Sequence, residues 1–216
     1  MISHTRLLLV LLLFASAAAA QTPIAILEQR TIRLPVSLPR PGYELHLTAA
    51  YLERTGWSAE DIQTLVAQSS RILAQCELGL TEMTLVRLAA PERFLDYATG
   101  PARELARAVP LARPTVYFVA DTRQRPAFDA EAIGRGNSRT RPELADTVWV
   151  TRATRDPGVA LAHELAHVLM DSGEHSTEEG NLMRDETTAQ NLRLTSAQCA
   201  RLRSRALEHG LVRETP

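Results

Sequence analysis

Two histidines and a glutamate, spaced for one face of a helix, are the residues in this chain best suited to chemistry. The segment His163-Glu164-Leu165-Ala166-His167 places its two imidazoles four positions apart. Side chains at helix positions i and i+4 lie on one face about one turn apart, so both rings can bind one metal ion. A Zn²⁺ ion accepts imidazole nitrogens at about 2.0–2.1 Å, and Glu164 is placed to act as general base on water beside the metal. The segment therefore predicts a catalytic zinc site.

The third ligand of such a site must come from further along the chain. Catalytic zinc in proteins has three protein ligands and one position open to water. His175 is the first candidate, because Gly173 would end the helix and let the backbone reverse two residues before it. Three carboxylates remain as alternatives for this position, Glu186 first, then Glu174 and Asp185.

These residues, in this order, resemble the metzincin metallopeptidases, and most closely their matrixin branch. After His175-Ser176, four residues lead to Asn181-Leu182-Met183, which is the usual spacing of that branch. The resemblance implies a zinc-dependent endopeptidase with one catalytic Zn²⁺ ion and peptide or protein substrates. It also implies that Met183 belongs to a turn beneath the metal, although an ordinary core methionine is an equally good interpretation. The specific motif covers residues 163–183.

The segment after His167 departs from the family pattern in its spacing. That pattern has a glycine three residues after the second histidine and the third histidine three residues further on. Met170 stands at the glycine position and Gly173 at the histidine position, so His175 comes two residues late. A helix longer by three residues, about 4.5 Å, with a tight return through Gly173 would still bring His175 to the metal.

Composition excludes several other chemistries. All 24 basic residues are arginine against 25 acidic residues, so the formal net charge is −1 and no lysine can form a Schiff base or a P-loop. Phosphate contacts need clustered basic residues, and the chain has no basic block. We therefore expect no nucleic-acid partner.

Residues 1–20 are typical of a secretory signal peptide. Arg6 supplies the positive start, Leu7–Phe14 the apolar core, and Ala18-Ala19-Ala20 a small-residue cleavage site. The apolar run is too short to span a bilayer, and no run of about 18 apolar residues follows it. We expect an exported protein, secreted or periplasmic, with one metallopeptidase-like domain over 21–216 and no membrane span in the mature chain.

Export also bears on Cys76 and Cys199, the two cysteines of the chain. In an oxidising compartment a pair of cysteines more often forms a disulfide than a metal or redox site. We predict a Cys76–Cys199 bridge from the middle of the chain to its last helix. Two buried free thiols are the alternative.

The hydrophobic pattern around the motif predicts one α/β (α+β) domain. By resemblance to the metzincins, we expect a twisted mixed sheet of about four to five strands, packed on a long helix and the zinc-motif helix. The upper part would span about 43–172, and the lower part, about 173–216, would be a small C-terminal helical subdomain. Residues 21–42, with four prolines, are predicted to be an extended arm.

The predicted elements follow periodicity and capping signals. Glu44–Ala50 alternates as a half-buried strand does, Asp156 and Pro157 are typical of a helix start, and Ser58/Asp61 and Thr195/Gln198 are capping-box pairs. Strands are predicted at 44–50, 83–88, 115–120 and 147–151, with a weak edge strand near 128–133, and helices begin after Ser58, at Pro101, after Asp156 and after Thr195.

Three functions are compatible with these residues. The first is a secreted peptidase that hydrolyses peptide bonds with metal-activated water and Glu164 as base. The second is a zinc-binding metzincin-like domain without proteolytic activity, acting as a binding module, which the late position of His175 suggests. The third is a zinc hydrolase of non-protein amides such as cell-wall peptides. Cleavage specificity and oligomeric state are not encoded in any motif.

Overall fold

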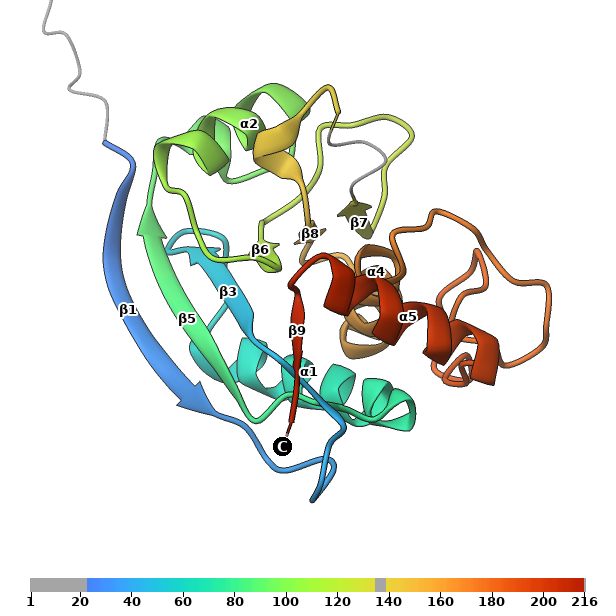
Figure 1. Ribbon diagram of the computed structural model, residues 1–216. Helices are drawn as coiled ribbons and strands as arrows, with labels where there is room; N and C mark the ends of the chain where they lie inside the picture. The colour runs from blue at the N-terminus through green and yellow to red at the C-terminus, as the bar shows by residue number, and fades with distance from the viewer. Residues whose placement is uncertain (1–22, 135–138, 216) are drawn as a thin grey trace, which may run out of the picture.

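A six-stranded mixed sheet forms the centre of the part of the chain described by the computed structural model, residues 23–134 and 139–215. The predicted signal peptide, residues 1–20, lies outside the described residues. The strand order is β1-β5-β3-β6-β8-β7 (Figure 1), with the four central strands parallel and β1 and β7 antiparallel at the edges. The strands are β1 (Ala25–Arg33), β3 (Leu47–Leu52), β5 (Glu82–Ala89), β6 (Thr115–Phe118), β7 (Ala130–Ile133) and β8 (Thr147–Val150).

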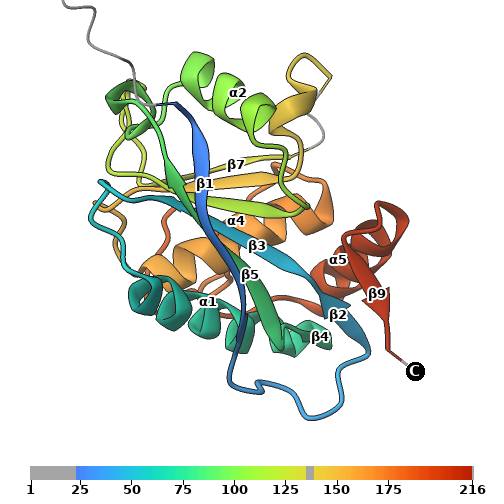
Figure 2. The same cartoon turned by 90° about the vertical axis from the view of Figure 1, so that its left-hand side faces the viewer.

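Helices cover both faces of this sheet (Figure 2). One face packs against α1 (Ala59–Leu73) and α4 (Pro157–Met170), and the other against α2 (Thr99–Ala108). Short 3₁₀ helices are η1 (Ala74–Cys76), η2 (Glu92–Phe94) and η3 (Pro142–Leu144). The mixed α/β fold is therefore confirmed, with one strand more than the largest number expected.

The chain ends in α5 (Ser196–Glu208) and β9 (Val212–Glu214). Strand β9 pairs antiparallel with β2 (Tyr43–Leu45), which also pairs with β4 (Leu78–Gly79) in a small three-stranded sheet. The C-terminal segment is thus fixed to the start of the domain rather than only to its neighbours in sequence.

The single half-buried strand predicted at 44–50 is divided between β2 and β3, and β3 is buried on both faces rather than on one. Leu47 and Ala49 face the hydrophobic cluster beneath α1 and α4, while Ala50 and Leu52 face the cluster beneath α2. Parallel strands in the middle of an α/β sheet carry helices on both sides, which removes any solvent-facing side.

Residues 25–33 of the predicted arm form the edge strand β1 instead. They pair with β5 along almost their whole length, and most of their side chains remain exposed. Pro23 and Pro35 lie just outside the strand, where their missing N–H groups do not interrupt the pairing.

Three of the four predicted helix starts are confirmed in position, and the fourth helix, α2, begins at Thr99, two residues before the predicted Pro101. Ser58 and Thr195 both cap their helices in complete capping boxes. Asp156 does occupy the position before α4, but its backbone is left-handed and its side chain makes no capping hydrogen bond. Pro157, whose ring fixes a helical φ, stands at the first position of the helix.

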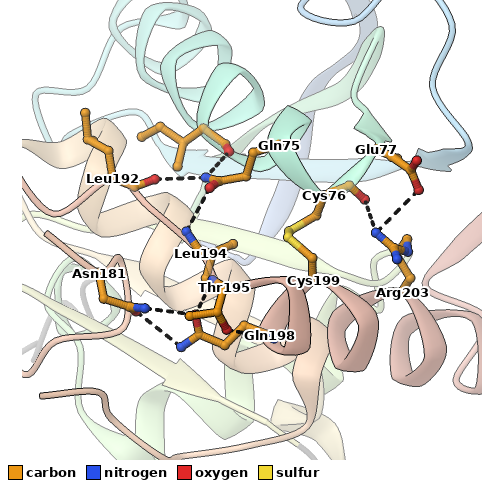
Figure 3. Close-up of a disulfide and its surroundings, with 11 residues drawn as sticks. Gln75, Cys76, Glu77, Asn181, Leu192, Leu194, Thr195, Gln198, Cys199 and Arg203 are labelled. Atoms are coloured by element: carbon orange, nitrogen blue, oxygen red, sulfur yellow. Dashed lines mark hydrogen bonds and ion pairs between the residues drawn. A yellow bond between two sulfur atoms is a disulfide. The ribbon is translucent and has the colours of Figure 1, made fainter. Parts of the chain in front are cut away.

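The predicted disulfide is present between Cys76, at the end of η1, and Cys199, in α5 (Figure 3). It joins the end of α1 to the C-terminal helix across 123 residues of sequence. Among the described residues, no helix is long and apolar enough to cross a bilayer.

Candidate metal centre

Helix α4 carries His163, Glu164 and His167 at the edge of the packed core. Twelve of its fourteen residues are buried, because it lies between the sheet, α1 and α5. His163 and His167 are among the buried residues, at 3% and 8% exposure. A helix fixed on several sides gives both rings a defined orientation.

The structure brings His175 to the same point as His163 and His167. The Nε2 atoms of His163 and His167 are 2.9 Å apart, and those of His167 and His175 are 3.2 Å apart. Among the described His, Cys, Asp and Glu residues, these three form the group able to hold a metal ion, with nitrogens within 4.8 Å of one another.

The opposite nitrogen of each ring, Nδ1, contacts an oxygen that can only accept a hydrogen bond. Each Nδ1–oxygen distance is 2.7 Å, to the carbonyl of Leu182 for His163, to the carbonyl of Ser172 for His167 and to the Oδ1 of Asp185 for His175. Each Nδ1 therefore carries the proton, and each Nε2 presents a lone pair.

Lone pairs that face one another at 2.9 and 3.2 Å repel one another unless a cation lies among them. Burial lowers the pKa of His163, and burial together with the neighbouring His163 lowers that of His167 to about 4, so both rings stay neutral near pH 7. Tetrahedral zinc with Zn–N bonds near 2.0–2.1 Å separates its nitrogens by about 3.4 Å. The donor set therefore fits a divalent ion such as zinc.

The backbone reverses at Asp171, not at Gly173 as the sequence suggested. Asp171 follows the last helical residue, Met170, and adopts φ 48° and ψ 51°, the left-handed conformation that closes many helices. Its N–H bonds the His167 and Val168 carbonyls. The helix therefore ends at Met170, three residues before Gly173, and residues 172–174 make the return.

The three carboxylates considered as a third ligand have other neighbours. Asp185 accepts from His175, and Glu174 is exposed and lies 2.7 Å from Arg201. Glu186 lines a cavity beside the histidines. From the sequence, Asp185 was a candidate metal ligand, whereas in the structure it accepts a hydrogen bond from His175. Sequence spacing alone does not distinguish a ligand from the hydrogen-bond partner of a ligand.

Met183 is buried at 1% exposure in the main hydrophobic cluster. Its N–H donates to the Asn181 side chain at 2.9 Å, and its carbonyl accepts from the Ser176 N–H at 2.7 Å. Leu182, immediately before it, supplies the carbonyl that holds His163. No motif in the sequence marks that carbonyl as part of the site.

Glu164 lies between two cavities, of about 400 and 770 Å³, and lines both. His175 and Ala130 of the edge strand β7 also line both. Burial raises the pKa of Glu164 to about 8, and the negative charge of Glu131 on β7 adds to the shift. A carboxyl group held in this way favours the protonated form until a positive charge is placed beside it.

Known proteins resemble this chain in the course of the backbone. Neither a protein-family model nor a curated protein matches the sequence. Metalloproteinase-II from Bacteroides fragilis superimposes with a TM-score of 0.57 at 16% identity, over 82% of this chain and 57% of that protein. Archaemetzincin from Methanopyrus kandleri superimposes with a TM-score of 0.51 at 13% identity, over 79% of this chain and 99% of that protein.

This chain therefore spans little more than half the length of the Bacteroides protein, and nearly all of the archaemetzincin. At such low sequence identity, the similarity shows a shared backbone fold and nothing about activity. Together with the mixed sheet and the helices described above, it shows that the chain has a metzincin-like fold.

Proposed function

We propose that this chain is an exported, zinc-dependent endopeptidase with a matrixin-like site. One observation carries the proposal. Three imidazole nitrogens, each freed for a metal by a hydrogen bond on the far side of its ring, converge beside Glu164 in an open cleft. The metzincin-like fold and the signal-like residues 1–20 support it.

In this proposal His163, His167 and His175 hold the zinc ion, which when bound supplies Lewis acidity for the scissile carbonyl and for water. Glu164 accepts a proton from the attacking water and returns it to the departing amine. Its pKa of about 8 without metal would be lowered by the nearby cation, which leaves the carboxylate ready to act as base.

The substrate would lie along β7. This strand is at the edge of the sheet and pairs on one side with β8, so its other side offers backbone groups to an extended peptide. Cavities on both sides of Glu164 and His175 leave room for residues before and after the cleaved bond, which favours endopeptidase action.

Replacement of the proposed base tests the mechanism. Glu164→Ala should retain stoichiometric zinc by elemental analysis and lose peptide hydrolysis by about 10²–10⁴-fold, measured by mass spectrometry of a peptide-library digest. Glu174→Ala, the matched control, removes an exposed carboxylate that pairs with Arg201 and should keep both zinc and activity. Full activity in Glu164→Ala would end the proposal, as would a wild-type protein that binds no zinc.

A non-catalytic binding domain was considered because His175 comes two residues late. Since the Nε2 of His175 lies 3.2 Å from that of His167, the spacing gives no reason to prefer that alternative. A zinc hydrolase of cell-wall peptides would use the same site, and the peptide-library digest separates it from a protein-directed enzyme.

A further inference from the structure

The turn Asn181-Leu182-Met183 connects two of the three histidines to the C-terminal helix α5. Within it, the Leu182 carbonyl accepts from His163 Nδ1 at 2.7 Å. The Met183 carbonyl accepts from the Ser176 N–H at 2.7 Å, and Ser176 directly follows His175. Contacts that fix the conformation of this turn therefore fix the His163 ring directly and also fix the backbone next to His175.

The side chain of Asn181 shapes the turn from within. Its Oδ1 accepts from the Met183 N–H at 2.9 Å, and the residue is only 3% exposed. Its amide is paired with that of Gln198 in α5, because Asn181 Nδ2 donates to Gln198 Oε1 at 3.0 Å and Gln198 Nε2 donates to Asn181 Oδ1 at 3.2 Å. A longer contact, of 3.4 Å, joins Asn181 Nδ2 to Glu178.

Gln198 does more here than cap its helix. Its Oε1 also accepts from the Thr195 N–H at 2.8 Å, which completes the capping box of α5. A capping box needs only an acceptor at this position, so glutamate would serve equally well. The amide nitrogen, which capping does not require, is the atom that reaches Asn181.

The amide pair is itself anchored to η1, the short helix that follows α1, as Figure 3 shows. Cys199, the residue after Gln198, is bonded to Cys76. Next to Cys76, the Gln75 amide donates to the Leu192 carbonyl and accepts from the Leu194 N–H, both at 2.8 Å. The segment between these two residues then accepts from the Leu182 N–H through the Arg193 carbonyl, at 2.6 Å.

We propose that Asn181 and Gln198 are positioning residues of the metal centre, which hold the Leu182 and Met183 carbonyls where His163 and the His175 segment need them. The pair itself touches neither metal nor substrate. This inference rests on the proposed function only in that the three histidines bind a metal ion.

Zinc affinity and thermal stability, measured on the same variants, test the role. Gln198→Glu keeps the capping acceptor but places an oxygen against Asn181 Oδ1, and Asn181→Asp breaks the same pair from the other side. Each should weaken zinc binding about tenfold, the low end of the effect of outer-sphere partners.

Thr195→Ala is the matched control on the same helix turn. It removes the hydroxyl that caps Gln198 N–H but leaves the amide pair in place. The melting temperature should fall by about 2–4 °C, as expected for a lost cap in a chain of this length, with zinc affinity unchanged. Affinities are measured by competition of Zn²⁺ with a chromophoric chelator, and melting temperatures on metal-free protein.

The outcomes separate this inference from the proposed function. If the wild-type protein binds zinc and Gln198→Glu binds it equally well, the positioning role is wrong while the metal site stands. If affinity simply follows melting temperature across all variants, including Thr195→Ala, the pair is structural and the inference is overturned. A wild-type protein without zinc binding overturns the proposed function, and the inference with it.

Discussion

At the scale of residues, each of the three histidines has a hydrogen-bond acceptor on the side of its ring that faces away from the other two Nε2 atoms. Each ring donates from Nδ1 to a fixed oxygen, and two of these oxygens are backbone carbonyls, of Ser172 and Leu182. Such partners set the tautomer and orientation of a metal-binding imidazole. Glu164 differs from the histidines, because burial and the negative charge of Glu131 disfavour its charged form and outweigh the hydrogen bond from the Ala132 backbone, which favours it.

This difference predicts how the metal-free protein responds to pH. The pKa of Glu164 rises from 4.5 to about 8 on folding, so the folded state binds a proton that the unfolded state releases. Stability attributable to Glu164 should therefore fall as pH rises from about 4.5 to about 8, by on the order of a few kcal/mol. Glu164→Gln, which mimics the protonated acid, should be as stable as wild type at pH 4 and more stable at pH 8.5.

Urea unfolding of both proteins across this range measures the effect, since contributions of His163 and His167 are common to both. Saturating zinc should reduce the difference, because the cation stabilises the carboxylate. Parallel pH profiles for the two metal-free proteins would contradict the raised pKa of Glu164.

At the scale of elements, α4 is held close to α1 by a glycine. A Cβ on Gly158 would lie 2.8 Å from Gln68 Cβ and closer still to its amide. The Gly158 carbonyl also accepts from Ser69 Oγ at 2.7 Å. Because α4 carries two of the histidines, the separation of these helices bears directly on the site.

Gly158→Ala should therefore destabilise the protein by about 1–3 kcal/mol, as overpacking does, and should weaken zinc binding by moving α4. Gly42→Ala is the matched control, because the nearest atom to its new Cβ, Glu77 Cβ, lies at an ordinary contact distance of 3.6 Å. That change should leave the free energy of unfolding within about 0.5 kcal/mol of wild type. Chemical denaturation of both variants measures the difference, and equal effects at the two glycines would contradict the close contact at Gly158.

At the scale of the whole molecule, the C-terminal segment is tied back to the start of the domain in two ways. Strand β9 pairs with β2, and the disulfide joins η1 to α5. The segment between α4 and α5, which supplies His175 and Met183, is mostly irregular in backbone and depends on these ties for its position.

Removal of the disulfide should consequently cost stability and metal affinity together. The double variant Cys76→Ser, Cys199→Ser releases a closed loop across 123 residues, which predicts a loss of about 3–5 kcal/mol in the free energy of unfolding. Guanidinium unfolding of oxidised wild type, reduced wild type and the double variant measures this loss. If all three unfold at the same denaturant concentration, the bridge contributes nothing to the folded state.

The sequence by itself determined the elements whose signals are local. The capping boxes at Ser58 and Thr195 and the zinc-motif helix follow from residues within a few positions of one another, whereas the strand near 128–133 had only a weak local signal. The i, i+4 spacing of His163 and His167 belongs to the same class, because a helix alone brings the two rings together.

Only the tertiary structure decided how the site is completed. That His175 reaches the other rings despite its late position depends on Asp171 turning left-handed and on Asp185 and the Met183 carbonyl holding the return. The burial of β3 and the pairing of β1 likewise depend on what packs against them. These contacts join residues far apart in sequence, and no local pattern encodes which of many compatible partners a folded chain brings together.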